Sequence, residues 1–145
     1  MAGKFSEAIR SKVHQRANGL CEYCHTNERW QYVRFTLDHL TASSDGGGDD
    51  FDNLALACFH CNRRKSNKQF VVDEESGQTV MLFNPRLHRW ADHFIWSADG
   101  LRIIPLTAIG RATEKLLDFN RDRIQLIRAA DVLVNRHPPE DDPTQ

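Results

Sequence analysis

Residues 53–65 read NLALACFHCNRRK, and this stretch decides most of the expected fold. Its apolar start, residues 53–57, is too short for a helix and stands between a glycine-rich loop and a pair of cysteines, which favours a strand. Cys58 then opens a Cys-x-x-Cys turn, and residues 61–70 are expected to form a helix that carries several cations. The stretch therefore predicts a strand, a cysteine turn and a helix in direct succession.

The cysteine pair in this stretch matches an earlier pair. Cys21 and Cys24 have the same spacing as Cys58 and Cys61, and the chain has no other cysteine. Each turn can offer two thiolates to one ion, and four thiolates complete a tetrahedral zinc site with no position left for water. The pattern therefore predicts a structural zinc ion that joins two distant segments. Four unrelated buried thiols are the alternative. A thioredoxin-like redox site is disfavoured because there are two pairs, and neither follows the expected strand–helix context.

The composition is that of an ordinary globular protein. The chain has 145 residues, of which 40% are hydrophobic and 27% are charged, and this fits one domain or a small domain with an appendage. No apolar run reaches the roughly 18 residues of a transmembrane span, and the N-terminus lacks the apolar core of a signal peptide. No membrane partner is expected. The cytoplasm, where thiols stay reduced, is the expected location.

The rest of the first half is expected to build around the cysteine turns. Residues 6–17 predict a helix, because Ser6 can cap it and apolar residues recur on one face. The Asn-Gly pair that follows is typical of a helix end. Aromatic and β-branched residues predict a strand over residues 32–37. Residues 41–52, rich in serine, glycine and aspartate, predict a loop.

Polar residues between and beside the cysteine pairs follow a characteristic order. Asp38-His39 ends the first expected strand, Asn53 begins the second, and Asn62 follows the last cysteine. With the two cysteine pairs around them, residues 18–68 resemble the HNH endonucleases, a ββα-metal nuclease family with zinc-bearing members. The resemblance implies an α+β fold with a ββα-metal (His-Me finger) core stapled by zinc. It also implies DNA as the substrate.

The resemblance implies a role for each of these polar residues. His39 corresponds to the general base that activates water, and Asp38 corresponds to a ligand of a catalytic Mg²⁺ or Mn²⁺ ion. Asn53 corresponds to the middle asparagine, which holds the base in place. The family's usual final histidine is replaced here by Asn62, whose amide oxygen also suits Mg²⁺ or Mn²⁺. Taken alone, each residue is more typical of a turn, a loop or a helix start than of a catalytic site, so the prediction depends on their order.

A basic cluster follows the last cysteine, although the net charge of the chain is only −1. The cluster consists of Arg63, Arg64, Lys65 and Lys68. These cations lie on the helix expected to carry the metal ligand Asn62, so they are expected to face DNA phosphates. Contacts to phosphates position a duplex without reading its bases. The alternative is an ordinary solvated face.

The second half has no comparable signature. A strand is expected over residues 80–83, and a hairpin with strands at 93–96 and 101–104 is expected around an Asp-Gly turn. Two helices are expected to follow, over residues 107–119 and 120–135.

The chain is expected to divide into three parts. These are a zinc-stapled core over residues 1–70, an extension packed on it over residues 71–137, and a disordered tail over residues 138–145. Target choice and homodimerisation are both open as roles for the extension.

Two functions from different classes remain. The first is a metal-dependent endonuclease that hydrolyses DNA phosphodiester bonds. The second is a zinc-stabilised module that binds DNA or protein without catalysis. The first requires Asp38, His39 and Asn62 to converge in space, whereas the second does not, so the placement of these residues discriminates between the two.

Overall fold

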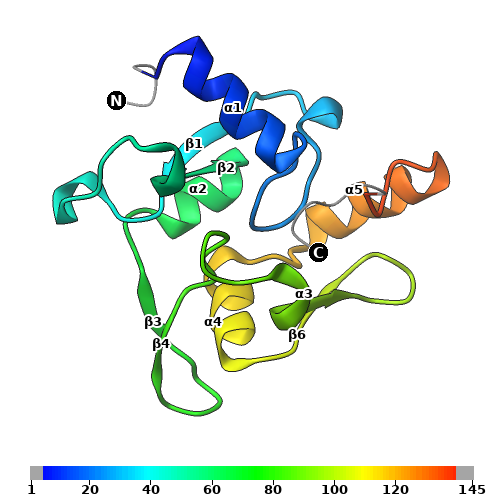
Figure 1. Ribbon diagram of the computed structural model, residues 1–145. Coiled ribbons are helices and arrows are strands. Elements are labelled where there is room, and N and C mark those ends of the chain that lie inside the picture. Colours follow the sequence, from blue (N-terminus) through cyan, green and yellow to red (C-terminus); the bar gives the residue numbers. More distant parts are fainter. Residues whose placement is uncertain (1–4, 140–145) are drawn as a thin grey trace.

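The computed structural model describes residues 5–139, which form a mixed α+β fold (Figure 1). The helices are α1 (Glu7–Ala17), α2 (Phe59–Lys65), α3 (Trp90–His93), α4 (Ala108–Leu117) and α5 (Asp122–Leu133). The strands form two-stranded antiparallel sheets: β1 (Thr36–His39) with β2 (Leu54–Ala57), β3 (Phe70–Val72) with β4 (Thr79–Met81), and β5 (Phe94–Trp96) with β6 (Ile103–Pro105). Within the described range, no helix is long and apolar enough to cross a bilayer.

The first helix begins and ends where the sequence indicates. The Ser6 side chain accepts a hydrogen bond from the Ile9 amide (3.2 Å), which satisfies one of the amides that a helix start leaves open. At the other end Asn18 adopts the left-handed conformation, with φ at 54°, as residues at helix ends often do. Val13 and Ala17 are buried, and α1 packs against β2.

The first strand starts later than expected. The sequence favours a strand over residues 32–37, but Tyr32 is fully exposed and β1 begins only at Thr36. The reason is the partner strand, because β2 ends at Ala57 and this residue pairs with Thr36. A high β propensity does not make a strand where no edge is available for pairing. The pairing continues to His39, so β1 ends at the start of the loop that leads to β2.

The helix after the second cysteine pair is shorter than the expected span of residues 61–70. It starts earlier because the Cys58 thiol caps it, accepting a hydrogen bond from the Cys61 amide (3.4 Å). It stops at Ser66, whose φ of 54° cannot continue an α-helix. Phe70 then enters β3 rather than the helix. β3 was not expected, because three residues are too few to show a strand pattern.

The second half has the expected order of elements, with small differences. β5 and β6 form the hairpin around Asp99-Gly100, and Gly100 adopts a φ of 76°. Thr107 caps α4 by accepting a hydrogen bond from the Gly110 amide (3.0 Å). The strand expected over residues 80–83 is β4, which ends at Met81, and the short helix α3 was not expected. The expected tail lies, from residue 140 on, outside the described residues.

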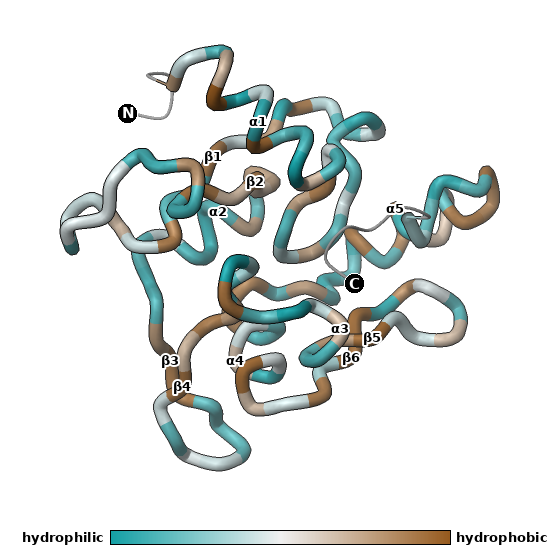
Figure 2. The backbone as a smooth tube through the Cα atoms, in the orientation of Figure 1, coloured by the Kyte–Doolittle hydropathy of each residue, from teal (hydrophilic) through white to brown (hydrophobic). Residues whose placement is uncertain are grey.

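One hydrophobic core contains side chains from both halves of the chain. β2 is buried over its whole length, and Trp90 and Phe119 join the core from the second half. The Trp90 indole donates a hydrogen bond to the Tyr23 carbonyl (2.9 Å). His60 of α2 lies 2.7 Å from the Leu117 carbonyl oxygen at the end of α4. Figure 2 shows the apolar strands β5 and β6 beside α3, and the polar turn that projects between β3 and β4.

Candidate functional site

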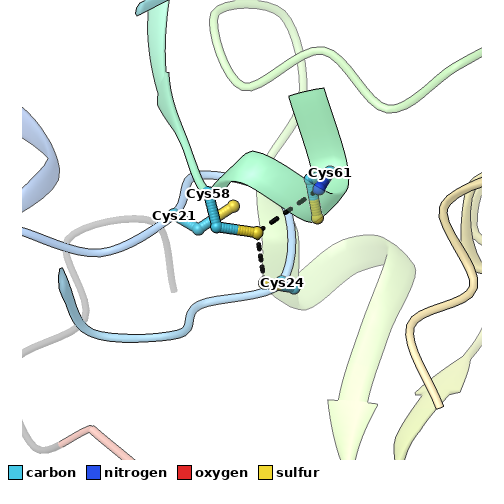
Figure 3. A group of neighbouring side chains, drawn as sticks. All are labelled: Cys21, Cys24, Cys58 and Cys61. Atoms are coloured by element: carbon cyan, nitrogen blue, oxygen red, sulfur yellow. Dashed lines mark hydrogen bonds between the residues drawn. The ribbon is translucent and has the colours of Figure 1, made fainter. Parts of the chain in front are cut away.

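The four cysteines come together at one buried point. Cys21 and Cys24 lie in the turn after α1, and Cys58 and Cys61 lie where β2 passes into α2 (Figure 3). Their sulfur atoms are all within 4.8 Å of one another, and those of Cys24 and Cys58 are 3.8 Å apart. Thiolates about 2.3 Å from one tetrahedral zinc ion are separated by roughly 3.8 Å, whereas the sulfurs of a disulfide are about 2.05 Å apart. The cluster is therefore compatible with structural zinc.

Glu22, between the first two cysteines, attaches their turn to β2. Its amide donates a hydrogen bond to the Leu56 carbonyl (2.8 Å), and its carboxylate accepts one from the Leu56 amide (2.7 Å). The other carboxylate oxygen bonds the Arg86 guanidinium, which comes from the second half. Glu22 is buried, so its charge needs these partners. The first cysteine turn is therefore also held by contacts that do not involve the thiols.

An open cavity of about 450 Å³ lies beside the second cysteine turn. Asp38 and His39 line it from β1, and Asn62 and Arg63 line it from α2. Three residues that the sequence singled out, Asp38, His39 and Asn62, therefore border one space although they come from two elements.

His39 is held at this cavity by a carboxylate from the following loop. Its Nε2 atom lies 2.7 Å from Asp49 Oδ1, and the Phe5 ring packs against the imidazole with 5.6 Å between the centroids. The histidine side chain is partly exposed (24%) and that of the aspartate is largely exposed (73%). Sequence reasoning missed Asp49, because several aspartates share this loop and no spacing distinguishes one of them.

Asn53 closes the loop between β1 and β2. Its side-chain oxygen accepts a hydrogen bond from the Thr41 amide (2.8 Å), and its Nδ2 donates to the carbonyls of Thr41 (3.0 Å) and Gly48 (2.7 Å). Within the loop, Gly47 lies so close to Thr41 that a Cβ atom would stand 1.8 Å from the Thr41 carbonyl oxygen. The asparagine thus fixes the backbone that follows β1.

Asp38 is buried and has two partners that the sequence did not indicate. Its Oδ2 accepts a hydrogen bond from the Tyr23 hydroxyl (2.6 Å), and the Lys65 ammonium lies 3.2 Å from the same oxygen. The Lys65 ammonium also donates to the His39 carbonyl (3.2 Å). Burial raises the pKa of Asp38, although the Lys65 charge and the Tyr23 hydrogen bond act in the opposite direction.

The four cations expected at DNA phosphates lie in different environments. Arg63 is exposed and lines the cavity. Arg64 and Lys68 are also exposed, and Arg64 Nε donates to the Leu116 carbonyl of α4 (2.9 Å). Lys65 departs from the expected surface position, because its ammonium pairs with Asp38 and its side chain is buried.

Comparison with known proteins identifies the segment that holds this site. The family model described as HNH endonuclease matches residues 21–68. This segment runs from the first cysteine to Lys68 and includes Asp38, His39 and Asn62. No curated protein and no solved structure matches the chain. Residues 21–68 are therefore an HNH endonuclease domain with a buried four-cysteine cluster.

Proposed function

We propose that the protein is a metal-dependent endonuclease that hydrolyses DNA phosphodiester bonds. The observation that carries the proposal is the convergence of Asp38, His39 and Asn62 on one cavity, within a segment that matches the HNH endonucleases. A general base and hard oxygen ligands for a divalent ion are the groups that metal-assisted hydrolysis uses. In this proposal the four cysteines bind zinc, which holds the frame of the site.

In the proposed reaction His39 is the general base that activates the attacking water. Asp49 accepts a hydrogen bond from Nε2, which leaves the lone pair of Nδ1 to take the proton from water. Asn53 is a positioning residue, because it fixes the backbone of the loop that carries Asp49.

The proposed catalytic ion is Mg²⁺ or Mn²⁺, held by Asp38 and Asn62. Both side chains offer oxygen atoms, which these hard ions prefer. The residues fit such an ion because both line the cavity, and because among the described residues the Oδ1 atom of Asp38 has a single partner, the Lys65 ammonium at 3.4 Å. When bound, the ion stabilises negative charge on the phosphate and on the leaving 3′ oxygen.

Duplex DNA is the proposed substrate, and the exposed members of the basic cluster are the proposed contacts to its phosphates. These are Arg63, Arg64 and Lys68. Lys65 is left out because it is buried. Contacts to phosphates carry no information about the bases, so this surface is expected to add little sequence preference.

Plasmid cleavage tests the proposal. Supercoiled DNA is incubated with Mg²⁺ or Mn²⁺ and the wild type, His39→Ala or His14→Ala. His14 is a matched control, because it is a partly exposed histidine of α1 that pairs with Glu28 (2.6 Å). Loss of a general base costs about 10²–10⁴-fold in rate. We therefore expect nicked or linear product from the wild type and the control, and almost none from His39→Ala.

Two outcomes would contradict the proposal, provided that all three proteins contain equal zinc. One is cleavage that survives His39→Ala, and the other is a wild type that cuts with neither ion. One observation favours the alternative, a zinc-stabilised binding module without catalysis, because the Lys65 ammonium already neutralises Asp38. DNA binding without cleavage would support that alternative.

A further inference from the structure

We propose that Lys65 is a resident counter-ion of Asp38 and makes divalent-ion binding depend on a DNA phosphate. In the free protein the ammonium neutralises the carboxylate that is offered to the ion. When DNA binds, its phosphate supplies the negative charge that the ion needs. This inference rests on the proposed function, because it takes Asp38 and Asn62 as the ligands of the ion.

The contacts of Lys65 show that its inward position is built into the fold. The residue is 3% exposed, and its ammonium lies 3.2 Å from Asp38 Oδ2, 3.4 Å from Asp38 Oδ1 and 3.2 Å from the His39 carbonyl oxygen. Three acceptors match the three N–H donors of an ammonium. Asp38 is 4% exposed and is held in turn by the Tyr23 hydroxyl. Separating this buried ion pair would leave each charge without its partner and with little water to replace it, which is costly.

The charges around the cavity disfavour a divalent ion alone. Asp38 and Lys65 cancel, Asn62 is neutral, and Arg63 adds a positive charge at the same cavity. Asp49 brings a carboxylate from the loop, but this group is bonded to His39. Protein sites for Mg²⁺ commonly combine one or two carboxylates with the phosphates of a substrate. Here the carboxylate is already neutralised, so the phosphate becomes necessary.

A dependence of this kind is reciprocal. If a DNA phosphate strengthens ion binding by some factor, the ion strengthens DNA binding by the same factor. Removal of the Lys65 charge should tighten ion binding to the free protein, because the ammonium and the ion would share the Asp38 carboxylate, and like charges at short range repel strongly even at an effective dielectric constant near 20. It should also weaken the coupling between the ion and DNA.

Manganese binding to the free protein is the first test. Mn²⁺ is titrated into zinc-loaded protein without DNA, and unbound Mn²⁺ is measured by electron paramagnetic resonance for the wild type, Lys65→Gln and Lys12→Gln. Glutamine can still donate hydrogen bonds but has no charge, and Lys12 is an exposed lysine of α1 that controls for net charge. We expect Lys65→Gln to bind Mn²⁺ at least about tenfold more tightly than the wild type. Lys12→Gln should bind like the wild type.

The titration is done at the same pH and ionic strength for all three proteins, so that only the charge of the substituted lysine differs. Equal or weaker Mn²⁺ binding by Lys65→Gln, at full zinc content, would overturn the inference. In that case Lys65 serves only to keep Asp38 ionised and in place.

The second measurement leaves Lys65 unchanged, so it does not depend on the folding of a Lys65 variant. The affinity for a fluorescein-labelled duplex is measured by anisotropy in His39→Ala, with and without Mn²⁺ at constant salt, because salt itself alters DNA binding. We expect Mn²⁺ to tighten DNA binding by about tenfold or more, and we expect this gain to vanish in His39→Ala/Asp38→Asn. No gain from Mn²⁺ would overturn the inference.

Neither measurement depends on cleavage. A wild type that cuts DNA, together with a Lys65→Gln protein that binds Mn²⁺ no better, contradicts the counter-ion role alone. A wild type that never cuts contradicts the proposed function, whatever the titration gives.

Discussion

Tyr23 connects the cysteine cluster to the candidate catalytic carboxylate through a single side chain. It stands between Cys21 and Cys24, and its hydroxyl donates a 2.6 Å hydrogen bond to Asp38. The residue is 1% exposed, so water cannot readily take the place of the donor. A buried hydrogen bond to a charged group typically contributes about 1.5–3 kcal/mol. The first cysteine turn therefore stabilises the site as well as offering metal ligands.

We expect Tyr23→Phe to lower the free energy of unfolding by about 1.5–3 kcal/mol, measured by urea denaturation of zinc-loaded protein. Tyr32→Phe is the matched control, because it removes the same hydroxyl from a fully exposed side chain. Its effect should stay within about 0.5 kcal/mol. If the two variants were equally stable, the hydroxyl of Tyr23 would not be what holds Asp38.

The candidate site could be predicted from the sequence where its chemistry follows a local order. His39 and Asn62 stand beside other recognisable residues, and the structure places both at one cavity. Lys65 and Asp49 could not be assigned in this way. A lysine that turns inward looks like its exposed neighbours in the sequence, and one loop aspartate looks like the next. Their partners are set by the path of the loop and by the packing of α2 on β1, which are tertiary features.

The boundaries of elements could be predicted where the signal is local. The helix α1 and the β5–β6 hairpin lie where expected, because a capping side chain and a turn dipeptide act within a few residues. The strands β1 and β3 were misplaced or missed, because strands of three or four residues exist only where a partner strand meets them. The class of fold, mixed α+β, was nevertheless correct.

The helix α5 is attached to the preceding segments by a buried arginine. Arg128 is 3% exposed. Its guanidinium donates to the carbonyls of Leu101 (2.8 Å) and Phe119 (2.7 Å), and to the Asn120 side chain (3.2 Å). Burial lowers the pKa of this guanidinium from its ordinary value. Loss of the side chain would leave buried acceptors without a donor, which is costly.

We expect Arg128→Met to lower the free energy of unfolding by about 2–4 kcal/mol, measured by chemical denaturation. Arg123→Met changes an exposed arginine of the same helix and should cost less than about 0.5 kcal/mol. Hydrogen–deuterium exchange should speed up in α5 in the first variant and remain unchanged in the second. Similar losses in both would show that α5 is held by other contacts.

At the scale of the whole molecule, the second half is bonded to the first cysteine turn. Arg86 pairs with Glu22, and the Trp90 indole bonds the Tyr23 carbonyl. The halves also share one hydrophobic core. We propose that residues 71–137 are an extension that depends on the core of residues 1–70, rather than a separately folding domain.

Removal of zinc should consequently unfold more than the cysteine turns. Zinc ligation contributes folding free energy, so we expect a chelator, or the change Cys58→Ser, to abolish exchange protection both in β2 and around Trp90. Re-addition of zinc to the chelated wild type should restore both, which controls for irreversible damage. Protection that survives around Trp90 while β2 exchanges freely would show that the second half folds alone.

The three consecutive glycines of the loop between β1 and β2 look interchangeable in the sequence, but their surroundings rank them. A Cβ atom at Gly47 would stand 1.8 Å from the Thr41 carbonyl oxygen. Gly46 has open space around it but a φ of 90°. At Gly48 a Cβ atom would stand at an ordinary contact distance of 3.6 Å from Asp50 Oδ2. Among homologues, position 48 should therefore drift freely, and position 46 should keep glycine or accept asparagine. Position 47 should vary least, so the substitution rates at these three positions should follow how closely the backbone of the loop packs at each of them.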